Sequence, residues 1–258
     1  MEYTRLGSTG MQVSRICLGC MGFGDATRWI HKWVLDEENS RPIVRKALEM
    51  GINFFDTANV YSTGSSEEIL GRALRDFANR DEVVIATKVG MDMGEVGKGL
   101  GAAHIRASID RSLARLKTDY VDLFQFHQVV QEKDWQAIIA PGGALGAALE
   151  ARRQGKVRFI GITSHGIPTA LKAISTGKFV SIQFPFNFIE TGAAETLLPL
   201  AQKMGLAFIA MKPFAGGAIS DASLAFKFLR SHPYILPIPG YDSVESVDQV
   251  TSFYESPN

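Results

Sequence analysis

The sequence contains only two cysteines, Cys17 and Cys20, spaced C-x-x-C. Two thiols cannot close a four-ligand zinc site, and no second pair exists, so a structural zinc site is excluded and no metal is expected. The segment RICLGC has the character of a strand entering a loop and not of a redox helix start. We therefore expect both cysteines to be reduced and structural, in a reducing compartment.

A net charge is also absent, because Lys and Arg number 27 and Asp and Glu number 27. Without a basic excess, nucleic acid and membrane surfaces are not expected as partners. The first residues, MEYTRLGSTG, have neither a basic n-region nor an apolar h-region, and no apolar run approaches the roughly 18 residues of a membrane span. The sequence thus predicts a cytoplasmic protein with no signal peptide.

What is present is a regular alternation of short apolar runs and amphipathic stretches. Near-continuous apolar runs are typical of parallel strands that are covered on both faces. The predicted strands are 15–20, 52–56, 82–88, 120–127, 157–162, 179–184, 206–211 and 235–238. The predicted helices are 39–50, 65–77, 103–116, 145–154, 168–176, 193–204, 222–231 and 244–253.

This alternation of eight strands with eight helices predicts an α/β fold, a (β/α)8 TIM barrel that forms a single domain over residues 1–258. Glycines at positions 51, 155, 177 and 205 supply helix stops just before strands. Residues 1–14 predict an N-terminal β-hairpin. A doubly wound open sheet is the alternative, but LGCMGFG after the first strand lacks the Gly-x-Gly-x-x-Gly turn of that fold.

Four polar residues follow apolar runs: Asp56, Lys88 and His127 at the predicted carboxyl ends of strands, and Tyr61 in the loop five residues after Asp56. Each alone has an ordinary structural explanation, such as a helix cap or a core histidine. In a barrel, however, these strand ends converge on one mouth, where active sites form. The four side chains together therefore predict a catalytic site.

Carbonyl reduction explains why these four residue types are found together. A phenol has an ordinary pKa of about 10, and a nearby ammonium favours its loss of a proton. We expect Tyr61 to donate the proton, Lys88 to assist it and Asp56 to pair with Lys88. His127 would hydrogen-bond the carbonyl oxygen as charge develops there.

The motifs FDTANVY, SEEILGRAL, VVIATK, SIDRSLARLKTDYVDLFQFHQ and GKVRFIGITSH closely resemble the aldo-keto reductase family, from about Tyr3 to Phe253. The resemblance implies a catalytic tetrad at Asp56, Tyr61, Lys88 and His127. It also implies an enzyme that reduces aldehydes or ketones to alcohols, with a small carbonyl compound as substrate. Hydride would come from a nicotinamide cofactor.

The resemblance further implies a set of cofactor contacts. Thr163, Ser164 and Gln183 match the residues that bind the nicotinamide carboxamide, and Asp56 is expected to border the cofactor as well. The remaining matches lie in the first-strand loop, after the seventh strand and in the phosphate-binding turn: Gly19, Cys20, Met211, Lys212, Pro213, Phe214, Gly240 and Ser243. Met211 stands where many members place an aromatic ring, and its thioether can still pack on a ring face.

The resemblance implies NADP(H) as the cofactor, with NAD(H) as the alternative. Many members bind the 2′-phosphate with basic residues where this sequence has Gly240 and Ser246, and Asp242 is acidic. We therefore expect only a moderate preference for NADP(H).

Two other functions remain open from the sequence. One is a cofactor-binding barrel that acts mainly as a binding or regulatory subunit. The other is an isomerase or aldolase in which Lys88 forms a Schiff base.

Three loops are the expected determinants of substrate choice: 91–102, 129–141 and 214–221. The sequence ends soon after the last predicted helix, which predicts an open, weakly selective pocket. The motifs do not indicate an oligomeric state.

Overall fold

The computed structural model describes residues 1–93 and 99–255. Eight parallel strands pair in the order β3 to β10. These strands are β3 (Leu18–Gly19), β4 (Phe54–Asp56), β5 (Val84–Val89), β6 (Val121–Phe126), β7 (Val157–Thr163), β8 (Ser181–Pro185), β9 (Ala207–Met211) and β10 (Ile235–Pro237). The amide of Gly19 donates to Pro239 O at 2.9 Å, and Gly19 bridges Gly240 in parallel. The first and last strands are thereby joined, and the predicted (β/α)8 barrel is confirmed.

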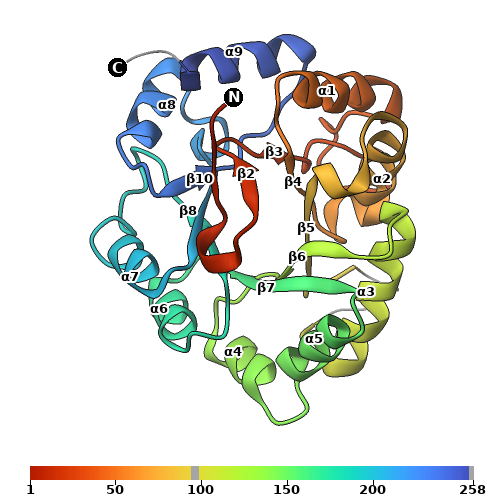
Figure 1. Cartoon of the computed structure of the whole chain (residues 1–258), viewed down its shortest axis with the longest axis vertical. Helices are drawn as coiled ribbons and strands as arrows, with labels where there is room; N and C mark the ends of the chain where they lie inside the picture. The colour runs from red at the N-terminus through yellow and green to blue at the C-terminus, as the bar shows by residue number, and fades with distance from the viewer. Residues whose placement is uncertain (94–98, 256–258) are drawn as a thin grey trace.

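Nine helices of the described residues surround the strands in Figure 1. They are α1 (Glu37–Glu49), α2 (Ser65–Phe77), α3 (Ala102–Leu116), α4 (Glu132–Ile139), α5 (Ala144–Arg153), α6 (Ile167–Ser175), α7 (Leu197–Met204), α8 (Ala222–Arg230) and α9 (Val244–Glu255). Within the described part of the chain, none of them is both long and apolar enough to cross a bilayer.

The alternation of side chains along each strand divides the core into two parts. Phe55, Phe124 and Phe126 point outward and pack with the helices in the larger cluster. Phe54 and Leu123 point into the barrel and pack in a second, smaller cluster. This two-layer arrangement accounts for the near-continuous apolar runs in the sequence.

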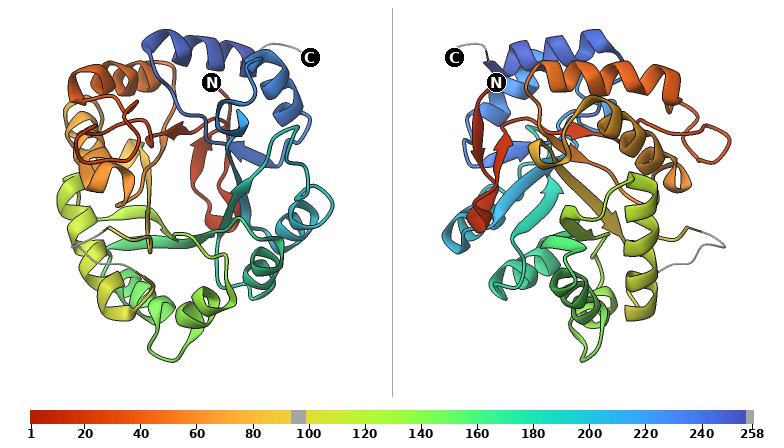
Figure 2. Two further views of the ribbon diagram at one scale, coloured as in Figure 1. Left: turned by 180° about the vertical axis from the view of Figure 1, so that it is seen from behind. Right: turned by 45° about the vertical axis from the view of Figure 1, so that its right-hand side comes forward.

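The predicted N-terminal hairpin is also confirmed. β1 (Tyr3–Arg5) pairs antiparallel with β2 (Gln12–Ser14). Leu6, Met11 and Val13 join the interior cluster of the barrel. The hairpin lies across the centre of the ring in Figure 1, so it closes one end of the barrel. The opposite end, seen from behind in Figure 2, carries the loops that follow the strands.

Helix boundaries follow local capping. α1 begins two residues before the predicted position 39, because the Asp36 side chain accepts a hydrogen bond from Asn39 N and caps the helix. α7 begins at Leu197, later than the predicted position 193. Close packing depends on Gly71 of α2, where an added Cβ would lie 2.5 Å from the backbone carbon of Leu116.

One helix was missed, because residues 129–141 were expected to form a loop. The structure instead has α4 there, with Trp135 and Ile138 buried. Gln131 and Asp134 form a reciprocal capping box at its start. With only eight residues and two buried apolar side chains, the helix gives a weak periodic signal in the sequence.

Candidate active site

A layer of buried polar side chains lies inside the barrel near the carboxyl ends of the strands. It comprises Asp56 on β4, Lys88 on β5, Gln125 on β6 and Gln183 on β8, each at most 2% exposed. Apolar side chains such as Phe54 and Leu123 lie one interior position earlier on their strands. A buried charged group needs partners, so the contacts within this layer determine what the site can do.

Lys88 is the centre of three hydrogen bonds. Its ammonium Nζ donates to Asp56 Oδ1 at 2.5 Å, to the backbone oxygen of Thr57 at 2.7 Å and to Tyr61 Oη at 3.3 Å. The same nitrogen lies 4.8 Å from the centre of the Tyr61 ring. The structure therefore brings together three of the four side chains expected to be catalytic.

The loop that carries Tyr61 is fixed by unusual backbone conformations. Ser62 and Thr63 have φ of 50° and 51°. Ser62 Oγ donates to Asp25 O and accepts from Asp25 N, both at 2.8 Å. These bonds tie the tyrosine loop to the loop after β3, so the half-buried Tyr61 is held between the barrel interior and that loop.

His127 comes directly after β6 and is half-buried. Its ring meets the Tyr61 ring edge to face, with centroids 6.1 Å apart. Its buried Nδ1 has no hydrogen-bond partner within the part of the chain that the structure describes. The fourth expected side chain thus lies beside the tyrosine, and the imidazole and phenol border the same space.

Burial and charge oppose each other in their effects on the pKa values of Tyr61 and Lys88, but they act together on His127. Burial raises the pKa of Tyr61, and the Lys88 ammonium opposes that rise without cancelling it. Burial lowers the pKa of Lys88, but Asp56 and Tyr61 outweigh it and leave the pKa raised. Burial, with Lys88 and His165, lowers the pKa of His127 well below its usual range. The site therefore holds a protonated phenol, an ammonium and a neutral imidazole near neutral pH.

These protonation states bear on Schiff-base chemistry. A lysine must lose its proton before its nitrogen can attack a carbonyl carbon. Lys88 is 1% exposed and held as an ammonium by Asp56. A Schiff base on Lys88 is therefore disfavoured, whereas the same ammonium is well placed to influence Tyr61.

The residues expected to bind a carboxamide lie on neighbouring strands. Thr163 of β7 and Gln183 of β8 are paired in register. The buried Thr163 Oγ1 has no partner among the described residues. Ser164 differs, because its hydroxyl donates to Val129 O at 2.6 Å and accepts from Gly166 N at 3.1 Å. Thr163 therefore offers an unpaired hydroxyl, while the Ser164 hydroxyl connects the loops that follow β6 and β7.

The other expected cofactor residues are distributed around the same mouth. Gly19 is half-exposed at the barrel closure, but the Cys20 side chain is fully buried with a free thiol. Met211 ends β9 on the interior face and is partly exposed. Lys212 is exposed, Pro213 is buried, and the Phe214 ring packs on Phe226 at 5.6 Å, among the apolar side chains of the outer core.

In the expected phosphate-binding turn, backbone amides already donate hydrogen bonds to the side chains of nearby serines. Ser246 Oγ accepts from the amides of Asp242 and Ser243, both at 3.2 Å. Ser246 N donates to Ser243 Oγ at 3.1 Å. The amides of Asp242, Ser243 and Ser246 are thus engaged in capping α9. Gly240 is exposed, and an added Cβ there would meet nothing within 4 Å.

The loop between β3 and α1 was not predicted to border the site. The half-buried Trp29 of this loop packs with Tyr61 and Met91 against a small cluster formed by Val60 and Met93 together with Ala58. A tryptophan in a segment without periodicity was the available signal. Of the loops that were expected to set selectivity, 91–102 lies partly outside the described residues, which exclude 94–98.

Gln125 was also missed. It is a polar residue inside the apolar strand VDLFQF, in the same alternation phase as His127, and this phase was the signal that could have revealed it. Its side-chain amide donates hydrogen bonds to Asp56 and Gln183 of the buried layer.

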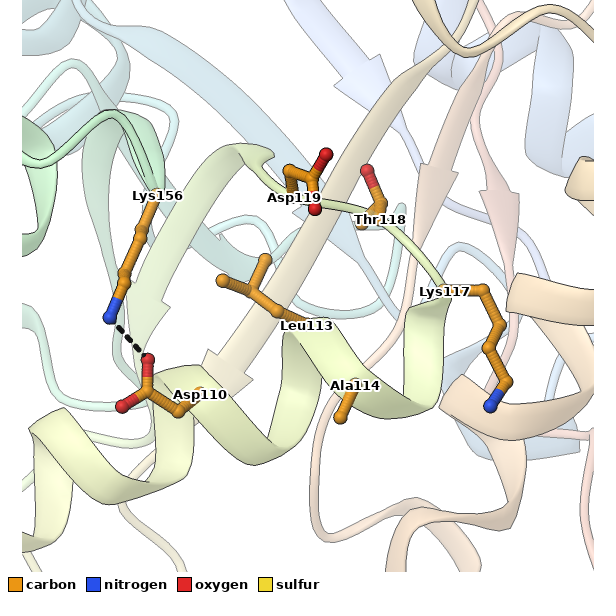
Figure 3. Close-up of a pocket in the computed structure, with 7 residues that line it drawn as sticks. All are labelled: Asp110, Leu113, Ala114, Lys117, Thr118, Asp119 and Lys156. Atoms are coloured by element: carbon orange, nitrogen blue, oxygen red, sulfur yellow. Dashed lines mark hydrogen bonds and ion pairs between the residues drawn. The ribbon is translucent and has the colours of Figure 1, made fainter.

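A hollow lies away from these residues, on the outside of the barrel (Figure 3). It has a volume of about 440 Å³ and lies where α3 ends and β6 and β7 begin. Its Lys156 forms an ion pair with Asp110 at 2.6 Å. It faces the amino ends of the strands and shares no residue with the polar layer, so it is not the catalytic candidate.

Comparison with known proteins gives a consistent result. The model of the aldo/keto reductase family matches residues 15–227. Versiconal hemiacetal acetate reductase of Aspergillus parasiticus is 35% identical, over 90% of this chain and 73% of that protein. The uncharacterized oxidoreductase YrpG of Bacillus subtilis is also 35% identical, over 87% of this chain and 70% of that protein.

A solved structure is similar over the whole chain. The aldo-keto reductase AKR11C1 from Bacillus halodurans, in its holo form, aligns with a TM-score of 0.84 and 25% identity. The alignment covers 100% of this chain and 92% of that one.

Proposed function

The chain belongs to the aldo/keto reductase family, and we propose that it reduces aldehydes and ketones to alcohols with NAD(P)H, using Tyr61 as the proton donor. The family expected from the sequence motifs is confirmed by the match over residues 15–227. The chain is therefore an oxidoreductase that acts on carbonyl compounds. The proposal concerns the proton donor, the cofactor and the substrate, and it treats residues 1–258 as one domain.

The observation that carries the proposal is the hydrogen bond from Lys88 Nζ to Tyr61 Oη at 3.3 Å, with Asp56 behind Lys88. When the phenol gives its proton to a carbonyl oxygen, a phenolate forms. The adjacent ammonium stabilises that phenolate, and Asp56 keeps the ammonium in place. The arrangement thus favours proton donation without leaving an unpaired buried charge.

His127 has a supporting role in the proposal. The burial of its ring and the nearby Lys88 lower its pKa, so the imidazole stays neutral. A neutral imidazole donates a hydrogen bond through one ring nitrogen. Directed at the carbonyl oxygen beside Tyr61, that donor holds the oxygen and stabilises the charge that develops on it.

The residues at the mouth fit a nicotinamide cofactor. Thr163 Oγ1 is buried without a partner among the described residues, and Gln183 is its neighbour across β7 and β8. We assign these two side chains to the carboxamide, with Met211 beside the ring. The bound cofactor would supply the hydride. The open surface at Gly240 and the start of α9 would lie toward the adenosine phosphates.

The wall formed by Trp29, Met91 and Met93 suggests the substrate class. These side chains belong to the same apolar cluster as Tyr61, beside which the substrate carbonyl would lie. Apolar walls stabilise apolar substrate groups and do not satisfy the hydroxyls of a sugar. We therefore propose apolar aldehydes as better substrates than polyhydroxylated ones.

One experiment separates an enzyme from a cofactor-binding subunit. Purified protein is mixed with NADPH or NADH, and the absorbance of the reduced cofactor is followed after adding a small reactive aldehyde. The proposal predicts cofactor oxidation that depends on both protein and aldehyde. Cofactor binding without oxidation across aldehydes, ketones and sugars would identify a binding subunit instead.

A further inference from the structure

Gln125 joins the expected acid–base residues to the expected cofactor site. Its Nε2 donates to Asp56 Oδ2 at 3.2 Å and to Gln183 Oε1 at 3.0 Å. All three side chains are at most 2% exposed. Asp56 also holds Lys88, which contacts Tyr61. One amide group therefore connects Gln183 to the proton donor through a continuous series of buried hydrogen bonds.

The connection to Gln183 depends on a glycine. Gln125 lies on β6 and Gln183 on β8, so β7 separates the two strands. At the level of Gln125, its partner residue on β7 is Gly161. A Cβ on Gly161 would lie 3.2 Å from Gln125 Cγ and 2.1 Å from Ser181 Oγ. The missing side chain leaves the space through which Gln125 reaches across β7.

The orientation of the Gln125 amide is determined by charge. An amide group has two N–H donors and one acceptor oxygen. Both neighbours of Nε2 are acceptor oxygens, one of them on a carboxylate. The reverse orientation would place Oε1 against that carboxylate and lose both bonds. Gln125 Oε1 is buried without a partner among the described residues, so no acceptor function competes with this orientation.

We propose that Gln125 is a positioning residue that couples the cofactor site to the proton donor, by holding Gln183 and Asp56 with a single amide. This inference rests on the proposed function. Gln125 binds the Gln183 oxygen and so fixes the orientation of the Gln183 amide, whose nitrogen is left on the side of the Asp56 carboxylate. It also fixes the second oxygen of Asp56, so that the first oxygen stays directed at Lys88.

The test uses two substitutions of the full-length protein. Gln125→Met keeps the length of the side chain and removes the donor. Gln125→Glu keeps the shape and, when protonated, can again donate to Asp56. Leu123→Val is the matched control, because Leu123 is fully buried one interior position earlier on β6 and belongs to the apolar interior cluster.

Three quantities are measured for each variant: the Kd of NADPH from tryptophan fluorescence, kcat/KM for an aldehyde across pH, and the Tm. We expect Gln125→Met to raise the Kd and to lower kcat/KM by about tenfold each, since hydrogen bonds to charged groups are worth that much. Leu123→Val should change the Tm but neither of the other two quantities by more than about twofold. The ratio of kcat/KM of Gln125→Glu to that of Gln125→Met should rise as the pH falls.

Gln125→Met with the parent's Kd and pH profile, and only a lower Tm, would show that the residue serves packing alone and would overturn the inference. A parent protein that binds NADPH and oxidises it with aldehyde would leave the proposed function standing in that case. A parent that binds neither NADPH nor NADH would overturn both. A parent that binds cofactor without turnover would still allow the Kd comparison to decide on Gln125.

Discussion

The ammonium nitrogen of Lys88 lies 3.3 Å from the phenol oxygen of Tyr61, and the Lys88 side chain is 1% exposed. In a poorly solvated site this contact strengthens as negative charge develops on the phenol. Burial nevertheless keeps the pKa of Tyr61 above its usual range despite Lys88. Lys88 therefore offsets part of the effect of burial and makes proton donation by Tyr61 easier. The behaviour expected of Tyr61 and Lys88 variants depends on this balance between burial and charge.

Tyr61→Phe should lower kcat for aldehyde reduction by about 10²–10⁴-fold, the usual contribution of general acid catalysis. The ring remains, so the Kd of NADPH should change little. Steady-state kinetics and fluorescence titration measure the two effects. Tyr3→Phe is the matched control, because Tyr3 is 51% exposed on the hairpin. Turnover of Tyr61→Phe within a few-fold of the parent would remove Tyr61 from its assigned role.

Lys88→Met should lower both activity and stability. It leaves the buried Asp56 carboxylate without its ammonium, and losing one partner of a buried pair costs about 3–5 kcal/mol of unfolding free energy. Urea denaturation measures this loss. Lys46→Met is the control, because its ion pair with Asp248 lies at the surface and should contribute little to stability. Equal losses from the two variants would contradict the buried pair.

The pH dependence of kcat/KM should be flat from about pH 6.5 to 9. Reduction needs Tyr61 protonated, and its pKa is raised above the usual value of about 10 by burial, so no alkaline loss begins below pH 9. His127 has its pKa lowered well below the usual value of about 6.5, also by burial, so it is neutral throughout this range. An inflection near pH 6.5 that disappears in His127→Gln would show that the imidazole titrates there.

The barrel, and the convergence of Asp56, Tyr61, Lys88 and His127 at its mouth, could be predicted from the sequence because both depend on local pattern. Strand alternation places Asp56 and Lys88 inside the barrel, and parallel strands bring their carboxyl ends together. Gln125 and Trp29 were missed for different reasons. The reach of Gln125 depends on its register with Gly161, and the place of Trp29 depends on how a non-periodic loop folds over the mouth. Neither relation is encoded in the periodicity of a single segment.

Trp29→Ala should raise KM for apolar aldehydes by about tenfold, while kcat changes less. The indole packs against the same apolar cluster as Tyr61 and Met91, so its loss removes apolar contact area from the expected substrate wall. Steady-state kinetics with short and long aliphatic aldehydes measure the effect, which should grow with chain length. Trp33→Ala is the control on the same loop, because Trp33 is 59% exposed. An equal KM change in both variants would indicate a general disturbance of the loop.

The preference for NADP(H) over NAD(H) should lie within about 30-fold, and Gly240→Lys should widen it by about tenfold. A charge-assisted hydrogen bond to the 2′-phosphate is worth about that factor, and neither Gly240 nor Ser246 supplies a cation. Gly240 is the better place to add one, because a new Cβ there meets nothing within 4 Å. Ser246→Arg would instead remove the hydroxyl that accepts from Asp242 N and Ser243 N, so it should lower the Tm along with any gain in affinity.

Fluorescence titration of the parent and both variants with each cofactor gives the ratios of the two dissociation constants. A thousandfold preference in the parent would mean that a basic side chain from another element already binds the 2′-phosphate. An unchanged ratio in Gly240→Lys would mean that the adenosine end of the cofactor lies away from this turn.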